Sequence, residues 1–188
     1  MVDSLDKYIV CLKDVISSEL CDDILEEYED SFDWSKARVG AAGEIDTSIR
    51  NLSNINMSDP DTKANNIEVR TALDSELFKA VGSALQGYSA KFPRCEVQLD
   101  TGYNLLRYKT GEFYKEHTDS FTHEPRVVSC SIALNDEYEG GEFAFFGSEV
   151  KIRADKGSAI MFPSNFMYPH QILPVTSGVR YSIVTWFR

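Results

Sequence analysis

The chain has 188 residues, of which 43% are hydrophobic and 26% charged, and we expect one globular domain over residues 1–188. Acidic residues outnumber basic ones by 30 to 19, which gives a net charge of −11. This balance argues against a protein that grips a nucleic-acid backbone, because such proteins need a basic surface. It favours neutral or basic partners.

The N-terminal region predicts a strand followed by a helix. Residues 8–12, YIVCL, form a short apolar run typical of a strand. Ser17 or Ser18 offers an N-cap, and Glu19 lies in the first turn, where the helix dipole favours an acidic residue. An amphipathic helix is predicted over 18–30 from apolar residues at helical spacing: Leu20, Ile24, Leu25 and Tyr28.

No segment has the pattern of a signal peptide, and none approaches the run of about 18 apolar residues that crosses a bilayer. The four cysteines stand at 11, 21, 95 and 130, without the spacing of a disulfide framework or a zinc motif. We therefore expect a cytoplasmic protein that has free thiols and no membrane contact.

Residues 35–66 are polar and lack apolar periodicity, so a surface loop is expected there. A second helix is predicted from Thr71, with Asp74 in a capping-box-like position, to Pro93. Strand patterns dominate after Cys95. The expected strands cover 96–99, 103–108, 126–134, 142–146, 149–152, 158–162 and the C-terminal segment that contains Arg180. Many short strands with regular turns indicate a barrel or a double sheet.

His117 and Asp119 stand two residues apart at the end of RYKTGEFYKEHTD, residues 107–119. In an extended segment such residues project to the same side. His170 is the candidate third ligand, since the remaining histidine, His123, lies in a loop-like stretch. Two histidines and one carboxylate leave several metal positions open, as in non-haem Fe(II) oxygenases, whereas a structural zinc site would close its shell with a fourth ligand.

The chain resembles the Fe(II)- and 2-oxoglutarate-dependent dioxygenases in three features. They are the His117, Asp119 and His170 pattern, a basic residue ten positions after His170, and the sequence Gly140-Gly141-Glu142 between Asp119 and His170. The similarity is strongest to their prolyl 4-hydroxylase-like group, and it extends from about residue 15 to the C-terminus. It implies an α+β, mainly β fold, with a double-stranded β-helix (jelly-roll) core and two N-terminal helices packed on one sheet. It also implies Fe(II) and 2-oxoglutarate as cofactors, O2 as a reactant and ascorbate as a candidate reductant.

The resemblance assigns the far carboxylate of 2-oxoglutarate to Arg180, Ser182 and Tyr108. Arg180 and Ser182 share one strand face, so a guanidinium and a hydroxyl can hold one carboxylate. Prolyl 4-hydroxylases generally have lysine at the position of Arg180, and the arginine keeps the charge. Phe143 stands where the family often has a threonine that contacts the cosubstrate, a contact for which Ser182 can compensate.

The resemblance also points to three substrate residues. Arg126 and Trp186 match positions at the peptide end of the pocket in prolyl hydroxylases. Arg50, in DTSIRNL, leads into a segment that resembles the start of a mobile substrate-covering loop. Arg126 shares strand parity with Val128 and other apolar residues, so its charge needs a carboxylate partner or a polar cavity.

The activity implied is hydroxylation of a prolyl residue in a peptide or protein loop, as in procollagen-proline 4-dioxygenases. An oxygenase of a free amino acid, another side chain or a small metabolite is the alternative within the enzyme class. A non-catalytic metal-binding β-barrel is the alternative from a different class. Arg180 and Tyr108 argue against it, because a mere metal binder needs neither.

Overall fold

A computed structural model describes residues 5–40, 43–97, 99–123 and 125–188. Its larger sheet has seven strands, in the order β1-β11-β7-β14-β5-β4-β2. Their bounds are β1 Val10–Leu12, β2 Ser35–Lys36, β4 Ser53–Asn56, β5 Asn104–Lys109, β7 Val128–Ala133, β11 Ala159–Pro163 and β14 Val179–Phe187. β14, the longest strand, pairs antiparallel with both β5 and β7 and so lies at the centre of this sheet.

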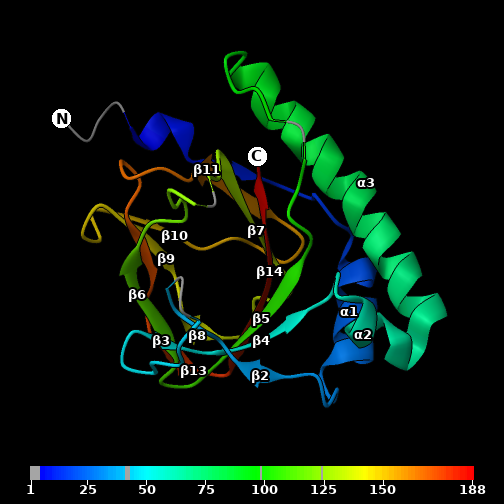
Figure 1. Cartoon of the computed structure of the whole chain (residues 1–188). Coiled ribbons are helices and arrows are strands. Elements are labelled where there is room, and N and C mark those ends of the chain that lie inside the picture. Colours follow the sequence, from blue (N-terminus) through cyan, green and yellow to red (C-terminus); the bar gives the residue numbers. More distant parts are fainter. Residues whose placement is uncertain (1–4, 41–42, 98, 124) are drawn as a thin grey trace.

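The smaller sheet has five strands in the order β10-β9-β12-β6-β3, and a two-stranded ribbon joins β13 and β8. Their bounds are β3 Arg50–Asn51, β6 Phe113–His117, β8 Glu139–Gly140, β9 Phe143–Phe145, β10 Val150–Ile152, β12 His170–Ile172 and β13 Val175–Ser177. The two sheets form a double-stranded β-helix-like core (Figure 1), which confirms the expected mainly β fold.

The helices cover the larger sheet on the side away from the smaller one (Figure 1). They are α1 Ser18–Tyr28, the short α2 Pro60–Lys63 and the long α3 Ile67–Lys91, with single 3-10 turns at Asp6–Tyr8 and Ala64–Asn66. Ser17, one of the two predicted candidates, caps α1, since its hydroxyl accepts a hydrogen bond from the Leu20 amide at 3.0 Å. None of the helices in the described ranges is long and apolar enough to cross a lipid bilayer.

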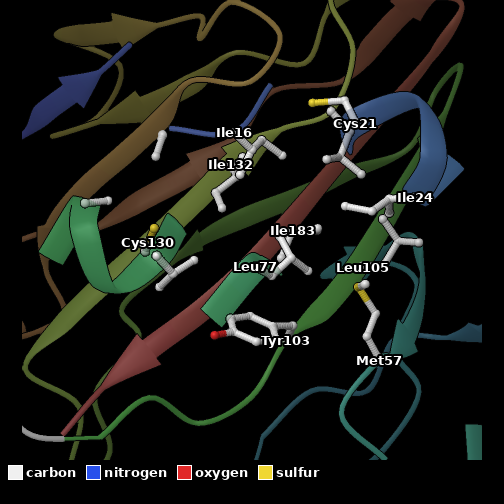
Figure 2. Packing of buried hydrophobic residues seen from close by; sticks show 14 of the residues in the cluster. Ile16, Cys21, Ile24, Met57, Leu77, Tyr103, Leu105, Cys130, Ile132 and Ile183 are labelled. Atoms are coloured by element: carbon white, nitrogen blue, oxygen red, sulfur yellow. The ribbon is translucent and has the colours of Figure 1, made fainter. Parts of the chain in front are cut away.

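Two buried clusters result from this layering. One lies between the helices and the larger sheet, where Ile24 of α1 and Leu77 of α3 pack with Leu105, Ile132 and Ile183 (Figure 2). The other lies between the two sheets and contains the aromatic side chains Tyr108, Phe143, Phe145 and Phe162. β7 contributes to both clusters, because all six of its residues are buried. The strand therefore has two inner faces, as expected for a central strand in a layered fold.

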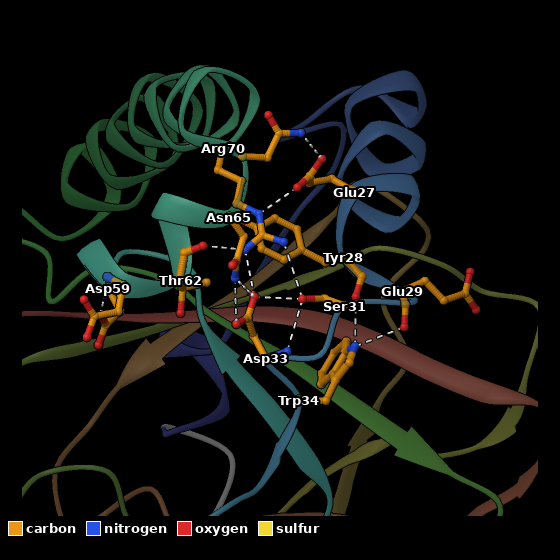
Figure 3. A network of polar contacts seen from close by, with 12 residues as sticks. Glu27, Tyr28, Glu29, Ser31, Asp33, Trp34, Asp59, Thr62, Asn65 and Arg70 are labelled. Atoms are coloured by element: carbon orange, nitrogen blue, oxygen red, sulfur yellow. Dashed lines mark hydrogen bonds and ion pairs between the residues drawn. The ribbon is translucent and has the colours of Figure 1, made fainter.

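Arg70 ties α3 to α1 and to the segment that follows α1 (Figure 3). Its side chain is 4% exposed, and it forms ion pairs with Glu27 at 2.6 Å and with Asp33 at 2.8 Å. It also lies over the ring of Tyr28, 4.5 Å from the centroid, and donates to the Thr62 carbonyl. These contacts hold the first turns of α3 against α1.

Several predicted boundaries were wrong. Residues 35–66, expected to be a loop, contain β2, β3, β4 and α2, although residues 41–42 lie outside the described ranges. α3 begins at Ile67 rather than Thr71, because Arg70 anchors that turn by tertiary contacts. A strand was expected over 96–99, but the described residues of this segment are not in a strand. Leu99 nevertheless exchanges backbone hydrogen bonds with Arg188 at the end of the chain.

Candidate metal centre and cosubstrate cavity

His117, Asp119 and His170 lie together at one end of the smaller sheet. His117 ends β6 and His170 begins β12, and the two residues are direct partners in the antiparallel pairing of those strands. Asp119 follows β6 after one residue, and its amide donates to the Ser164 carbonyl at 3.2 Å. One candidate ligand atom from each of the three residues lies within 4.8 Å of the others. This is the grouping that the sequence predicted.

Both imidazoles are oriented by the backbone. His117 Nδ1 lies 2.8 Å from the Lys115 carbonyl, and His170 Nδ1 lies 3.1 Å from the Tyr168 carbonyl. A carbonyl oxygen only accepts hydrogen bonds, so each Nδ1 carries a hydrogen, and Nε2 is the nitrogen left to bind a metal ion. The Nε2 atoms face Asp119, at 3.5 Å for His117 and 3.6 Å for His170. Two imidazole nitrogens and one carboxylate thus converge, a donor set that fits Fe(II).

Burial sets the protonation states of this group. It lowers the pKa of His170 to about 4, which makes this imidazole neutral at pH 7 and able to bind a cation. Burial alone would raise the pKa of Asp119. The two histidines and a 2.7 Å hydrogen bond from the Ser129 hydroxyl outweigh it and hold that pKa well below its usual range. Asp119 therefore stays ionised, and its carboxylate can bind a metal cation.

Sequence reasoning missed Ser129 and Tyr114 beside the metal group. Ser129 donates to Asp119 and lies 2.8 Å from the Ser164 hydroxyl, inside the fully buried strand β7. Tyr114 stacks on His117 with ring centroids 3.5 Å apart. The sequence feature that could have identified Ser129 is the alternation of small polar and apolar residues along β7. Ser129 and Ser131 alternate with Val128, Cys130 and Ile132 and so lie on the opposite face of the strand. A strand buried on both faces can direct such serines into a polar cavity.

The cavity beside these ligands lies between the sheets. Arg180, Ser182, Tyr108 and Trp186 all line it, as do Arg50 and Phe143. Arg180 is 5% exposed, and its guanidinium donates to the Ser182 hydroxyl at 2.9 Å and lies 5.1 Å from the centroid of the Tyr108 ring. The sequence placed Arg180 and Ser182 on one face of β14, and both side chains point into this cavity.

Arg180 is a buried cation that lacks a counter-ion among the described residues, none of which places a carboxylate within ion-pair distance of it. An uncompensated buried charge is costly, so the site is complementary to a bound anion. Gly141 makes room for the arginine. Its φ is +67°, and a Cβ there would lie 3.0 Å from Arg180 Cδ. The carboxylate of 2-oxoglutarate fits this position in charge and depth.

Of the three predicted substrate residues, Arg50 and Trp186 line both the cavity and an adjoining groove, and Arg126 lines the groove alone. Arg50 stacks over Tyr114 at 4.8 Å from the ring centroid, and Arg126 stacks over Trp186 at 3.8 Å. Arg126 also donates to the Asp119 carbonyl at 3.2 Å. It precedes β7, which begins at Val128, so the strand parity predicted for Arg126 does not apply. His123, the remaining histidine, is exposed and stacks on Phe121.

Comparison with known proteins agrees with this geometry. Residues 103–188 match the family described as the 2OG-Fe(II) oxygenase superfamily. A PKHD-type hydroxylase of Alteromonas mediterranea is 33% identical over 95 residues, which cover 44% of this chain and 41% of the relative. Procollagen-lysine,2-oxoglutarate 5-dioxygenase 1 of Rattus norvegicus is 27% identical over 180 residues, 92% of this chain and 23% of that protein. The chain thus aligns with less than half the length of these relatives.

A prolyl hydroxylase from Trichoplax adhaerens, solved in complex with a hypoxia inducible factor oxygen degradation domain peptide fragment, shares the fold. Its TM-score is 0.74 at 19% identity, over 99% of this chain and 86% of that one. A Pseudomonas putida prolyl-4-hydroxylase gives a TM-score of 0.70 at 22% identity, over 100% and 96% of the two chains.

Proposed function

We propose that this chain is a member of the 2OG-Fe(II) oxygenase superfamily that uses Fe(II) and 2-oxoglutarate to hydroxylate a prolyl residue in a peptide or protein loop. Bound iron would activate O2, one oxygen atom of which would convert a C–H bond to C–OH while the other oxidises 2-oxoglutarate to succinate and CO2. In the proposal, His117 and His170 bind the ion through Nε2 and Asp119 binds it through a carboxylate oxygen.

Arg180 is proposed to bind the far carboxylate of 2-oxoglutarate, with Ser182 and Tyr108 beside it. A guanidinium can hold a carboxylate with two parallel hydrogen bonds, which fixes the orientation of the bound acid. Burial raises the pKa of Tyr108 to about 12, so its hydroxyl keeps its proton and can donate to the same carboxylate.

The observation that carries the prolyl assignment is the junction between the cavity and the outer groove. The two spaces share Arg50 and Trp186 in their linings. A peptide chain lying in the groove can therefore direct one side chain past Trp186 toward the metal ligands. A proline ring is small, apolar and rigid, so an aromatic wall can position it at little entropic cost.

A lysyl side chain is the competing substrate, since one relative is named as a procollagen-lysine dioxygenase. A lysyl ammonium entering the cavity would meet Arg50, since Arg180 is paired with the far carboxylate of 2-oxoglutarate in the proposal, and among the described residues the lining offers it only the carboxylate of Asp119. That carboxylate is the proposed metal ligand. A cationic substrate would therefore be repelled, whereas a neutral proline ring would not.

Peptide libraries test this assignment. We expect proline-containing peptides to stimulate succinate formation in the presence of Fe(II), 2-oxoglutarate, O2 and ascorbate, the proposed reductant. The product should gain one oxygen atom, about 16 Da, at proline, as shown by tandem mass spectrometry. Peptides with alanine in place of proline are the matched control. Oxidation only at lysine, at another side chain or on a free amino acid would contradict the prolyl assignment and leave the oxygenase class unchanged.

Trp186→Ala and Arg126→Ala test the proposed substrate end of the pocket. Both variants should lose most of the peptide-stimulated turnover while keeping the slow decarboxylation of 2-oxoglutarate that occurs without substrate. If peptide-stimulated turnover were unchanged in both variants, neither residue would contact the substrate.

A further inference from the structure

The outer groove that adjoins the cavity has a strongly basic lining. Four of its eight lining residues are cations, namely Lys36, Arg38, Arg50 and Arg126. The first two come from β2 and the residues after it, Arg50 comes from β3, and Arg126 precedes β7. None of the described residues that line the groove has a carboxylate. Side chains from three separate parts of the chain thus bring positive charge to one surface.

The hydrogen bonds of Arg38 and Arg50 leave their charge in place. Arg38 donates to the Gly43 carbonyl at 2.7 Å, and Arg50 donates to the Arg38 carbonyl at 2.8 Å. Carbonyl oxygens orient a guanidinium but do not neutralise it. Lys36, in contrast, forms an ion pair with Glu112 at 2.7 Å. Arg38 and Arg50 therefore contribute positive charge to the groove, and the bond from Arg50 to the Arg38 carbonyl couples their positions.

This local charge opposes the charge of the whole chain, which is −11. Much of the negative charge lies elsewhere, for example in a second groove between α1 and α3 that contains Asp23, Glu26, Glu27 and Glu76. Exposed charges act within about one Debye length, roughly 8–10 Å at physiological salt. A substrate in the groove therefore meets the basic lining, and the net charge is a poor guide to what binds there.

We infer that the groove binds carboxylate side chains of the substrate peptide, on residues that flank the one inserted into the cavity. This inference rests on the proposed function, because it takes the occupant of the cavity to belong to a peptide. The preferred substrate is then a proline-containing segment with Asp or Glu nearby. That is the opposite of the neutral or basic partner that net charge alone favours. Ser35, Asn54 and Asn104 supply neutral hydrogen-bonding groups for the peptide backbone along the same surface.

Matched peptide pairs test the inference by direct binding. Each pair has one sequence with Asp or Glu at a position beside proline and a partner with Asn or Gln there. A second set replaces the proline by alanine. Fluorescence anisotropy with labelled peptides, and with protein loaded with 2-oxoglutarate and a non-reactive divalent metal, gives the dissociation constants. We expect the acidic member to bind about three- to ten-fold more tightly at about 0.05 M salt, and the preference to disappear near 0.5 M.

Arg38→Gln removes one exposed cation from the groove and should reduce the acidic preference measurably, for example from about ten-fold to about three-fold. Arg94→Gln is the matched control, since Arg94 is exposed and does not line the groove, and it should keep the full preference. Equal binding of acidic and amide peptides to the wild type would overturn the inference, as would an unchanged preference in Arg38→Gln.

Hydroxylation measured on the same peptides separates the two proposals. If acidic peptides bind more tightly but no proline is oxidised, the prolyl assignment is wrong and the proposal that the groove binds carboxylates stands. If both peptides are oxidised at proline and bind with equal affinity, the prolyl assignment stands and the proposal that the groove binds carboxylates is wrong.

Discussion

At the scale of single residues, the candidate metal centre depends on two backbone carbonyls. Those of Lys115 and Tyr168 hold Nδ1 of His117 and His170, which leaves both Nε2 atoms facing Asp119. Ser129 holds the carboxylate from the other side. The side chains are thus oriented before any ion binds, which reduces the conformational entropy lost on binding.

Removing any of the three proposed ligands should abolish iron-dependent succinate formation. We expect this for His117→Ala, Asp119→Ala and His170→Ala, because three protein ligands are the minimum for this kind of site. Succinate assays and iron content per chain measure the loss, and circular dichroism checks that the fold persists.

His123→Ala is the control for these variants, because His123 is exposed and lies outside the ligand group. It should retain wild-type turnover and iron content. Wild-type iron affinity and turnover in His170→Ala would show that His170 is not the third ligand.

Arg180→Ala should raise the concentration of 2-oxoglutarate required for half-maximal turnover by about ten- to a hundred-fold. A hydrogen bond to a charged group contributes about 1.5–3 kcal/mol, which corresponds to that range of affinity. Ser182→Ala should have a smaller effect, since a neutral hydroxyl contributes about 1 kcal/mol. Titrations of 2-oxoglutarate and Fe(II) in parallel separate cosubstrate binding from metal binding. Equal cosubstrate requirements in Arg180→Ala and the wild type would remove Arg180 from the site.

The sequence identified the residues of the centre that belong to a spaced motif, and it missed those that support them. His117, Asp119, His170 and Arg180 have a recognisable order along the chain. Ser129 and Tyr114 are common residues in ordinary strands. Their positions become significant only when β7 and β6 are placed against their neighbours, and that is information about tertiary structure.

At the scale of elements, α3 depends on Arg70 as well as on its apolar face. Leu73, Leu77, Val81 and Tyr88 pack against the larger sheet, and Ile67 at its start is 56% exposed. Because the first turn lacks apolar contacts, the ion pairs of Arg70 with Glu27 and Asp33 are what fix it to α1 (Figure 3). This explains why apolar periodicity placed the start of the helix too late.

Arg70→Ala should lower the free energy of unfolding by about 2–3 kcal/mol. Removing one partner of a buried ion pair costs about 3–5 kcal/mol, and the partial exposure of Glu27 and Asp33 reduces that figure. Urea denaturation of both proteins measures the difference. Arg94→Ala, at an exposed arginine just after α3, should change stability by less than about 0.5 kcal/mol. Equal losses in the two variants would show that the network contributes nothing specific.

The contribution of this network should depend on pH. Burial alone would raise the pKa of Asp33, but hydrogen bonds from Arg70, Ser31 and Asn65 outweigh it and hold the pKa below its usual value. A lowered folded-state pKa means that the stabilisation is present above the unfolded pKa of about 3.9 and is lost as pH falls through the folded-state pKa. The stability difference between wild type and Arg70→Ala should therefore shrink below about pH 4. Denaturation curves between pH 7 and pH 3 test this, and a constant difference would contradict it.

Elements with a clear hydrophobic period were predictable, and those stabilised by pairing were not. The strands β5, β7, β11 and β14 and the helix α1 lie where apolar spacing placed them. β4, with the sequence SNIN, has little apolar content and forms because it pairs with β5 along its whole length. Backbone hydrogen bonds to a neighbouring strand leave no pattern in the strand's own residues. That is why 35–66 was expected to be a loop.

At the scale of the whole molecule, the two buried clusters have different roles. The cluster between the helices and the larger sheet is apolar, whereas the cluster between the sheets borders the polar cavity. The helices therefore stiffen one face of the larger sheet, whose other face presents Arg180, Ser182 and Trp186 to the cavity. The fold class was predictable from the family motifs, and the basic groove beside the cavity was not, because its cations come from separate segments.

Metal binding should stabilise the whole fold. A ligand that binds only the native state at about one hundred times its dissociation constant adds about 2.7 kcal/mol, or roughly 5–10 °C in Tm for a chain of this size. Calorimetry under anaerobic conditions with Fe(II) measures the shift, and a chelator should reverse it. His123→Ala should show the same shift as the wild type. A comparable shift in His170→Ala would place the ion elsewhere.

The position of β12 in the smaller sheet has a consequence for the order of folding. β12 lies between β9 and β6, and both of these strands precede it in the chain. A nascent chain that has emerged only as far as β9 therefore has a gap where β12 belongs, and it has His117 and Asp119 without His170. Closing that gap is a late, non-local step, and such steps are slow because distant segments must first meet. The chain thus gains its complete set of ligands only as the smaller sheet becomes continuous, so a partly folded chain has little capacity to capture a reactive metal ion.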